Sequence, residues 1–161
     1  MVTMNTKRLI TCTIVASLLA LTGCATSPED EQRRKDMEAD IDEILSYELD
    51  PLEYGEVRRC LSESDFRSYR ALGNRHLLFW GRQDRRWVNV LRGRCPNLRD
   101  SSVFIMKPNA GSQLCEMDRF EVVDRGEPLS RAGTAPTCVL GEFRPVTEAQ
   151  VKEIEDRLEM R

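Results

Sequence analysis

The sequence is poor in the residues that cofactor and metal chemistry most often requires. It has one histidine, and its six cysteines include no C-x-x-C pair, which argues against a thioredoxin-type redox centre and a zinc knuckle. It also lacks a glycine-rich phosphate loop and any DNA- or RNA-binding motif. We therefore expect no cofactor, no metal and no nucleic-acid partner. Because aromatic residues make up only 6% of the chain, a small domain also needs stabilisation beyond its apolar core.

Long hydrophobic runs are scarce as well. The one extended apolar run, residues 9–21, follows Lys7 and Arg8 and is interrupted only by small polar residues and Cys12. As a helix it would reach about 20 Å, which is short of the ~30 Å hydrocarbon core of a bilayer. The run therefore indicates a cleaved export signal rather than a permanent transmembrane helix.

The end of this leader, Leu21-Thr22-Gly23-Cys24, resembles the lipobox of bacterial lipoprotein precursors. The resemblance implies that residues 1–23 are removed and that Cys24 carries a diacylglycerol thioether and a further acyl chain such as palmitate, enough to hold a protein at a membrane. Ala25 after the cysteine, instead of aspartate, favours the outer membrane, facing the periplasm. The alternative is a plain secretory signal with Cys24 as an ordinary thiol.

Four cysteines remain for the mature protein once Cys12 leaves with the signal and Cys24 is lipidated. These are Cys60, Cys95, Cys115 and Cys138. An even number in an oxidising compartment predicts two disulfides, with three possible connectivities. Reduced buried thiols are the main alternative. Each bridge would close a loop of about fifty residues and stabilise the fold by roughly 4 kcal/mol.

Charge is strongly segregated along the chain, although the net charge is only −3. Residues 28–55 hold eleven acids and three bases, whereas residues 56–107 hold twelve bases, nearly all arginine, and five acids. Guanidinium groups bind phosphates and carboxylates in pairs of hydrogen bonds, so this block predicts an anion-binding surface for phospholipid headgroups, lipopolysaccharide or peptidoglycan carboxylates. The candidate residues are Arg58, Arg59, Arg75, Arg82, Arg85 and Arg86. The alternative is a solvated sheet surface, partly matched by the acidic segment.

Periodicity predicts an α+β fold, a small and mostly antiparallel β domain with a helix at each end. Ser27 followed by Pro28 starts an acidic helix over about 28–47, which is either a spacer or docks through its narrow apolar stripe. Thr147 and Gln150 form a capping box for an amphipathic C-terminal helix. Strands are expected at 64–70, 76–80, 87–91, 103–107, 113–124 and 137–143, with a two-residue turn at Gly73-Asn74 and a longer hairpin loop at 81–85. The domain limits are 1–23 for the signal, 24–55 for linker and acidic helix, 56–146 for the β-rich domain and 147–161 for the last helix.

No residue set predicts catalysis. His76 opens an apolar strand and suits a structural role, and Asp118 suits a turn cap or a partner for an arginine. Ser62, Ser64 and Asp65 are framed by no triad or elbow motif. We therefore expect that the protein is not an enzyme, unless the fold brings His76 against Asp118 in a cleft.

Five short motifs follow one another along residues 60–146: Cys60-Leu61-Ser62, Arg75-His76-Leu77-Leu78-Phe79, Arg94-Cys95-Pro96-Asn97-Leu98, Leu114-Cys115 with Asp118, and Cys138-Val139-Leu140-Gly141-Glu142-Phe143. In these motifs the chain resembles a domain of unknown function found in small proteobacterial envelope proteins. Because shorter relatives keep only the counterparts of Cys95 and Cys138, the resemblance implies a Cys95–Cys138 bridge and hence Cys60–Cys115. The family brings no activity. We expect a lipid-anchored, non-enzymatic envelope protein that binds or supports other components; the alternative is a protein-directed inhibitor or adaptor acting through loop 126–136.

Overall fold

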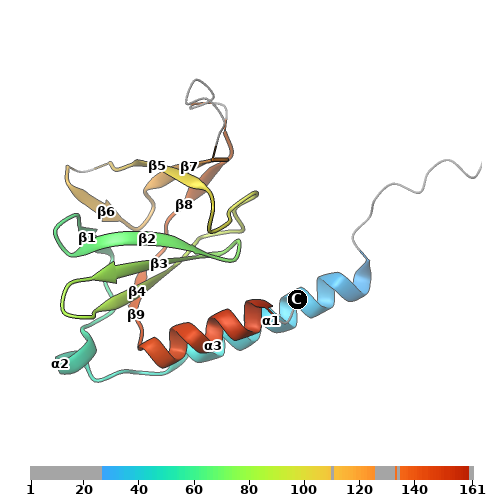
Figure 1. Cartoon of the computed structure of the whole chain (residues 1–161), viewed down its shortest axis with the longest axis horizontal. Helices are drawn as coiled ribbons and strands as arrows, with labels where there is room; N and C mark the ends of the chain where they lie inside the picture. The colour runs from blue at the N-terminus through green and yellow to red at the C-terminus, as the bar shows by residue number, and fades with distance from the viewer. Residues whose placement is uncertain (1–26, 110, 126–132, 134, 160–161) are drawn as a thin grey trace, which may run out of the picture. The chain divides into compact units, whose positions relative to one another are not determined.

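The structure, a computed structural model, describes residues 27–109, 111–125, 133 and 135–159. It confirms the α+β fold, in which helices precede and follow an antiparallel β body in the sequence (Figure 1). In chain order the elements are α1 (Pro28–Ser46), α2 (Pro51–Tyr54), β1 (Cys60–Ser62), β2 (Phe66–Leu72), β3 (His76–Gly81), β4 (Arg86–Val90), β5 (Val103–Lys107), β6 (Gln113–Cys115), β7 (Arg119–Val123), β8 (Thr137–Val139), β9 (Phe143–Pro145) and α3 (Glu148–Glu159). The chain divides into two compact units, residues 1–36 and 37–161.

The described part of the first unit is the start of α1. The Ser27 hydroxyl accepts a hydrogen bond from the Asp30 amide at 3.2 Å, so the predicted N-cap is confirmed. The pairs Arg33–Asp30 at 3.5 Å and Lys35–Glu31 at 3.8 Å join neighbouring turns of the same helix. The leader and Cys24 lie outside the described residues.

The second unit contains three antiparallel sheets, ordered β2-β3-β4-β9, β5-β7-β8 and β1-β6. The four-stranded sheet is covered on both faces, which explains why β3 is apolar along its whole length. Leu77 and Phe79 point into one hydrophobic cluster, while Leu78 and Trp80 point into another. A strand with one solvated face would alternate polar and apolar residues instead.

The inner cluster lies between the sheets and is rich in aromatic rings. Phe79 contacts Phe66 and Phe143 with ring centroids 5.2 and 5.3 Å apart, and Tyr69 stacks on Phe104 at 5.7 Å. These edge-on and offset contacts stabilise beyond simple area burial. The aromatic residues of the chain are few, but most of the phenylalanines are gathered here.

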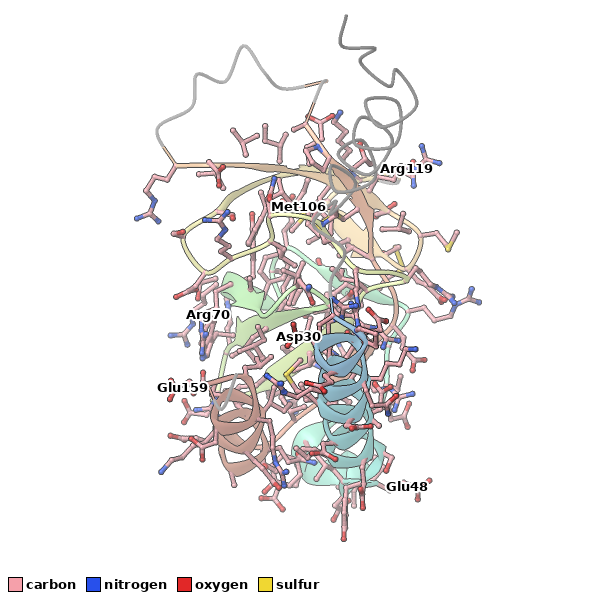
Figure 2. All side chains as sticks on the ribbon, turned by 90° about the vertical axis from the view of Figure 1, so that its right-hand side faces the viewer. Asp30, Glu48, Arg70, Met106, Arg119 and Glu159 are labelled. Carbon is pink, nitrogen blue, oxygen red and sulfur yellow. A yellow bond between two sulfur atoms is a disulfide. The ribbon has the colours of Figure 1, made fainter. Side chains whose placement is uncertain are left out.

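The outer cluster lies between the four-stranded sheet and two helical segments, residues 37–46 of α1 and α3, which Figure 2 shows side by side below the sheets. Ile41, Ile44 and Leu45 of α1 join Val151 and Ile154 of α3 over the sheet. The two helices run antiparallel, because Gln150 donates to the Ile44 carbonyl and Arg157 pairs with Asp40. Residues 37–46 therefore dock through the predicted apolar stripe.

Two disulfides join the four cysteines of the β body, with the implied pairing. Cys60–Cys115 links directly opposed residues of β1 and β6. Cys95–Cys138 links the loop after β4 to β8 in the three-stranded sheet, and both half-cystines are buried in the inner cluster. The second bridge therefore fastens one sheet to another.

The expected strand at 113–124 is wrong as a single element. It is two strands, β6 and β7, separated by a turn in which Met117 adopts a φ of 75°. The Asp118 carboxylate accepts hydrogen bonds from the Cys115 amide at 2.7 Å and the Asn109 amide at 3.0 Å. Asp118 thus caps a turn, one of the two roles predicted for it.

The expected strand at 137–143 is also wrong as a single element, since β8 and β9 belong to different sheets. The chain crosses between them at Gly141, whose backbone amide and carbonyl are bound by the buried Asn89 side chain at 3.0 and 2.7 Å. A Cβ atom at Gly141 would lie 2.0 Å from the Val90 carbonyl oxygen, so no other residue fits.

The remaining differences concern turns and short elements. Leu72 pairs with His76, so the turn at Gly73-Asn74 has three residues rather than two, with Gly73 at a φ of 66°. The hairpin loop between β3 and β4 lies where it was expected. The first strand of this sheet is β2, shifted two residues from the prediction. Neither α2 nor β1 was predicted.

Candidate anion-binding surface

The six candidate arginines do not form one free basic face. Arg58 and Arg59 precede β1, Arg75 lies in the β2–β3 turn, and Arg82, Arg85 and Arg86 lie at the β3–β4 hairpin. Acidic residues from other parts of the chain meet most of these arginines.

Two of the arginines each have one acidic partner. Arg58 pairs with Asp65 at 3.3 Å and lies 5.7 Å from the centre of the Trp87 ring, a cation–π distance. Arg86 pairs with Glu148 at the start of α3 at 3.1 Å and also donates to the Asp84 carbonyl. These contacts tie the four-stranded sheet to its neighbours.

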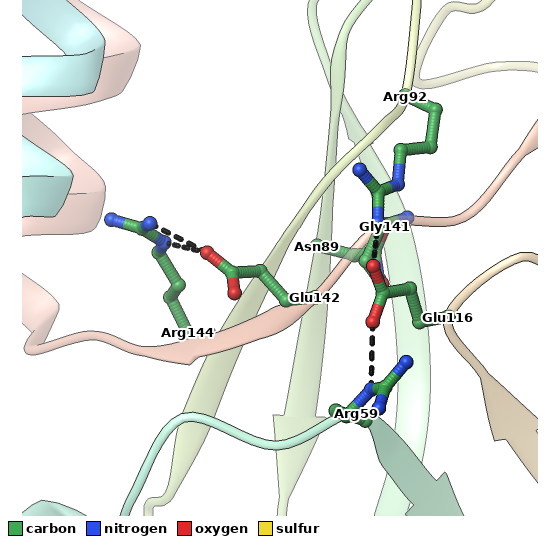
Figure 3. A network of polar contacts seen from close by, with 7 residues as sticks. All are labelled: Arg59, Asn89, Arg92, Glu116, Gly141, Glu142 and Arg144. Carbon is green, nitrogen blue, oxygen red and sulfur yellow. Dashed lines mark hydrogen bonds and ion pairs between the residues drawn. The ribbon is translucent and has the colours of Figure 1, made fainter.

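Two carboxylates each bridge two arginines. Glu116 binds Arg59 at 3.0 Å and also pairs with Arg92 (Figure 3). Glu38, on the docked part of α1, binds Arg75 at 3.3 Å and Arg94 at 2.6 Å. Both side chains are largely buried, with 13% and 14% of their surface exposed. We call Glu38 and Glu116 the bridging carboxylates; sequence reasoning anticipated that acids would match the arginines but identified neither residue.

The tip of the hairpin differs from the rest of the arginine block in its ion pairing. Among the described residues, no ion pair forms at Arg82 or Arg85, whereas the other four candidates are paired. The backbone of this loop is fixed by left-handed conformations at Gln83 and Asp84, with φ of 54° and 58°. Arg82 and Arg85 are therefore the candidates most available to an external anion.

A cleft of about 360 Å³ lies beside the bridging carboxylate Glu116. Its lining is Asp42, Leu45, Arg75, Val90, Leu91, Arg92, Glu116, Gly141, Glu142 and Arg144. Arg144 donates to Glu142 at 2.7 Å, near the two hydrogen bonds that join Asn89 to Gly141 (Figure 3). The lining holds three arginines and three acids, so the cleft is balanced in charge and gives a simple anion no net attraction.

The residues weighed for catalysis are dispersed. His76 is buried on β3, where burial and then the neighbouring Arg75 lower its pKa to about 4, against a smaller opposing effect of Asp42. Asp118 precedes β7 in another sheet, and no hydrogen bond joins the two among the described residues. Asp65 accepts from the Ser62 amide at 3.1 Å, and Ser64 donates to Ser62, so this group forms a turn.

The described residues contain no group of three or more metal-ligating side chains in reach of one ion. They also contain no helix with the length and hydropathy to cross a bilayer.

The fold and this surface define a small α+β protein with two disulfides and an arginine-rich, largely ion-paired sheet. The chain belongs to the family of unknown function DUF6491, which matches residues 7–160. No curated protein and no solved structure matches it.

Proposed function

We propose that the protein is exported, anchored by lipid on Cys24 and held in the periplasm as a non-enzymatic binding or structural module. The observation that carries this proposal is the pair of disulfides. Structural disulfides persist in oxidising compartments and are rare in the cytosol. Two disulfides within one small domain therefore favour an exported protein. The leader, with its lipobox-like end Leu21-Thr22-Gly23-Cys24, supports the same location.

The anchor is tested by the chemistry of the mature N-terminus. Cells making the full chain are fractionated, and the N-terminal peptide is analysed by mass spectrometry. The expected product begins at Cys24, carries acyl chains and lies in the membrane fraction. Cys24→Ala should leave an unprocessed precursor, whereas the control Cys12→Ala should be processed normally. A mature N-terminus at another residue would contradict the proposal.

For the binding chemistry, we propose an anionic group such as a lipid or lipopolysaccharide phosphate, held by Arg82 and Arg85. Arginines near an anionic surface each contribute about 1 kcal/mol. Four of the six candidate side chains have intramolecular partners, so the expected affinity is modest and falls as salt rises. The bridging carboxylates determine how many arginines of the block remain available to an external anion.

Vesicle binding tests this chemistry with residues 25–161. Sedimentation with phosphatidylglycerol-containing vesicles is compared with phosphatidylcholine vesicles. Arg82→Gln with Arg85→Gln should weaken binding, and the control Lys152→Gln, at an exposed residue of α3, should not. Glu38→Gln should strengthen binding several-fold because it frees Arg94 and leaves Arg75 with only the more distant Asp42, at 3.9 Å. Deleting the acidic helix would be a poor test, since Ile41, Ile44 and Leu45 belong to the outer cluster. If no form binds at low salt, the arginines serve only the fold.

A second candidate function is that of an adaptor or inhibitor directed at another envelope protein. Most of loop 126–136, the surface expected to serve it, lies outside the described residues. A different observation favours this function, namely an exposed apolar segment after α1.

A further inference from the structure

Residues 47–57, between α1 and β1, expose large apolar side chains on an ordered surface. Tyr47 is 74% exposed, Leu52 93% and Val57 54%; of the large apolar residues exposed among those described, only Val103 and Met117 lie elsewhere. Scattered apolar residues are ordinary on a protein surface, but several in one short segment indicate a contact site. We call Tyr47, Leu49, Leu52 and Val57 the apolar strip.

The backbone of the strip is held by its own hydrogen bonds. Asp50 caps α2 by accepting from the Leu52 amide at 2.9 Å, and Pro51 occupies the first turn. Gly55 ends the turn with a φ of 89° and donates to the Pro51 carbonyl at 3.0 Å. No residue of α2 is buried. The cap therefore directs the Leu52 side chain to the surface. Burial in a core does not explain the leucine at this position.

Two surface grooves flank the strip, and Tyr47 and Leu49 line both. One, of about 570 Å³, lies between α1 and α3 and adds Ile44 to its apolar lining. The other, of about 480 Å³, adds Leu45, Val57 and Pro145. The strip thus combines protruding apolar side chains with hollows of a size that accepts them from a partner.

The segment that carries the strip is acidic, and the arginine that lines each groove has an acidic partner, since Arg157 pairs with Asp40 and Arg144 with Glu142. Residues 36–57 contain nine acids and no base. Glu43, Glu48, Glu53 and Glu56 are exposed along the strip. An anionic bilayer surface would be repelled here, whereas a partner with basic residues around apolar anchors would be attracted and oriented.

We infer that the apolar strip docks a basic amphipathic segment of another protein, whose apolar side chains enter the two grooves while its Lys or Arg residues face the glutamates. This is the helix-in-groove mode of peptide recognition. The inference rests on the adaptor proposal and is independent of the lipid anchor and of Arg82 and Arg85.

A peptide assay tests the strip directly. The full chain in phosphatidylcholine nanodiscs is titrated into a fluorescein-labelled amphipathic Leu/Lys helix of about 14 residues, roughly four turns, with empty nanodiscs as the blank. Counterparts with Glu for Lys, or Ser for Leu, should bind at least about tenfold more weakly. Leu52→Asp should weaken binding of the Leu/Lys peptide about tenfold or more, while Met117→Asp, the same change at an exposed apolar residue outside the strip, should leave binding unchanged.

The acidic rim is tested separately with Glu48→Gln, Glu53→Gln and Glu56→Gln combined. Asp50 is left intact because it caps α2. This variant should bind more weakly and lose most of its salt dependence. Circular dichroism should show every variant folded, since none of these side chains is buried. If the Leu52→Asp and Met117→Asp variants bind the peptide equally well, the protein attracts the peptide without using the strip and the inference fails. The proposal of a lipid anchor on Cys24 does not depend on this result.

In cells, a photo-crosslinking amino acid at Leu52 is compared with one at Met117, and the crosslinked peptides are sequenced by mass spectrometry. The expected product from Leu52 alone is a segment of another protein that combines Lys or Arg with apolar residues. Crosslinks from Leu52 confined to lipid, to a second copy of this chain or to another segment of the same chain would overturn the inference, as would their absence.

Discussion

The two faces of the four-stranded sheet are closed by different means. The inner face meets the other sheets through aromatic rings and is fastened by Cys95–Cys138. The outer face meets helices through aliphatic side chains, and ion pairs such as Arg75–Glu38 and Arg70–Glu155 lie at its edge. One face is therefore held covalently and the other only by packing and charge. Loosening is therefore expected to begin on the helical side.

The same difference accounts for part of the segregation of charge in the sequence. Arg75 and Arg94 of the β body meet Glu38 of α1, so the acidic helix and the arginine block share one contact. Other arginines of the block pair with acids of the β body or of α3.

The largest expected effect comes from opening the inner face. Cys95→Ala with Cys138→Ala should lower the free energy of unfolding by about 4 kcal/mol, because it removes a cross-link over a long loop and leaves space among buried residues. Urea unfolding, extrapolated linearly to water, measures it. Cys60→Ala with Cys115→Ala is the comparison and should cost less, since that half-buried bridge joins strands already paired. An equal loss would show that burial in the inner cluster contributes little.

The outer face should yield next. Ile41→Ala, at a fully buried position on α1, should destabilise by about 3 kcal/mol through lost transfer energy and a cavity. Hydrogen exchange should show residues 37–46 opening more readily than β3. Glu43→Ala, on the exposed face of the same helix, is the control and should change stability by less than about 0.5 kcal/mol. Equal loosening of β3 and α1 would mean that the two faces unfold as one unit.

The sequence predicts correctly those features whose causes lie in neighbouring residues. The caps at Ser27 and Thr147 and the strand β5 depend on neighbouring residues, and they lie where they were expected. The break at Gly141 depends on Asn89, fifty-two residues away, which no local pattern indicates. The bridging carboxylates are also distant in sequence from their arginines. The apolar strip was missed because Leu52 has no periodic context; its signal was the Asp50-Pro51 cap before a leucine.

His76 makes the outer face sensitive to acid. Its pKa is lowered to about 4 by burial and Arg75, with Asp42 opposing, from about 6.5 in an unfolded chain. A folded pKa below the unfolded one means that the unfolded state binds the proton first, so stability falls as pH drops below about 6.5. The expected loss from this group is about 2 kcal/mol between pH 7 and pH 5. His76→Leu should reduce the loss of stability between pH 7 and pH 5, measured by urea unfolding at a series of pH values. An unchanged pH dependence would mean that carboxyl groups cause the loss.

The smallest effect expected concerns the junction of the two helices on the outer face. Gln150 accepts from the Thr147 amide at 2.9 Å as part of the capping box and donates to the Ile44 carbonyl at 3.0 Å, so one side chain both starts α3 and ties it to α1. Thr147→Ala should cost about 1 kcal/mol. Gln150→Glu keeps the acceptor and loses only the donor, whereas Gln150→Ala loses both and should cost more. Because Thr147 and Gln150 share the capping box, the double alanine variant should cost less than the sum of the single changes. Thermal melts at matched pH measure all four, and strict additivity would show that the box does not form as a unit.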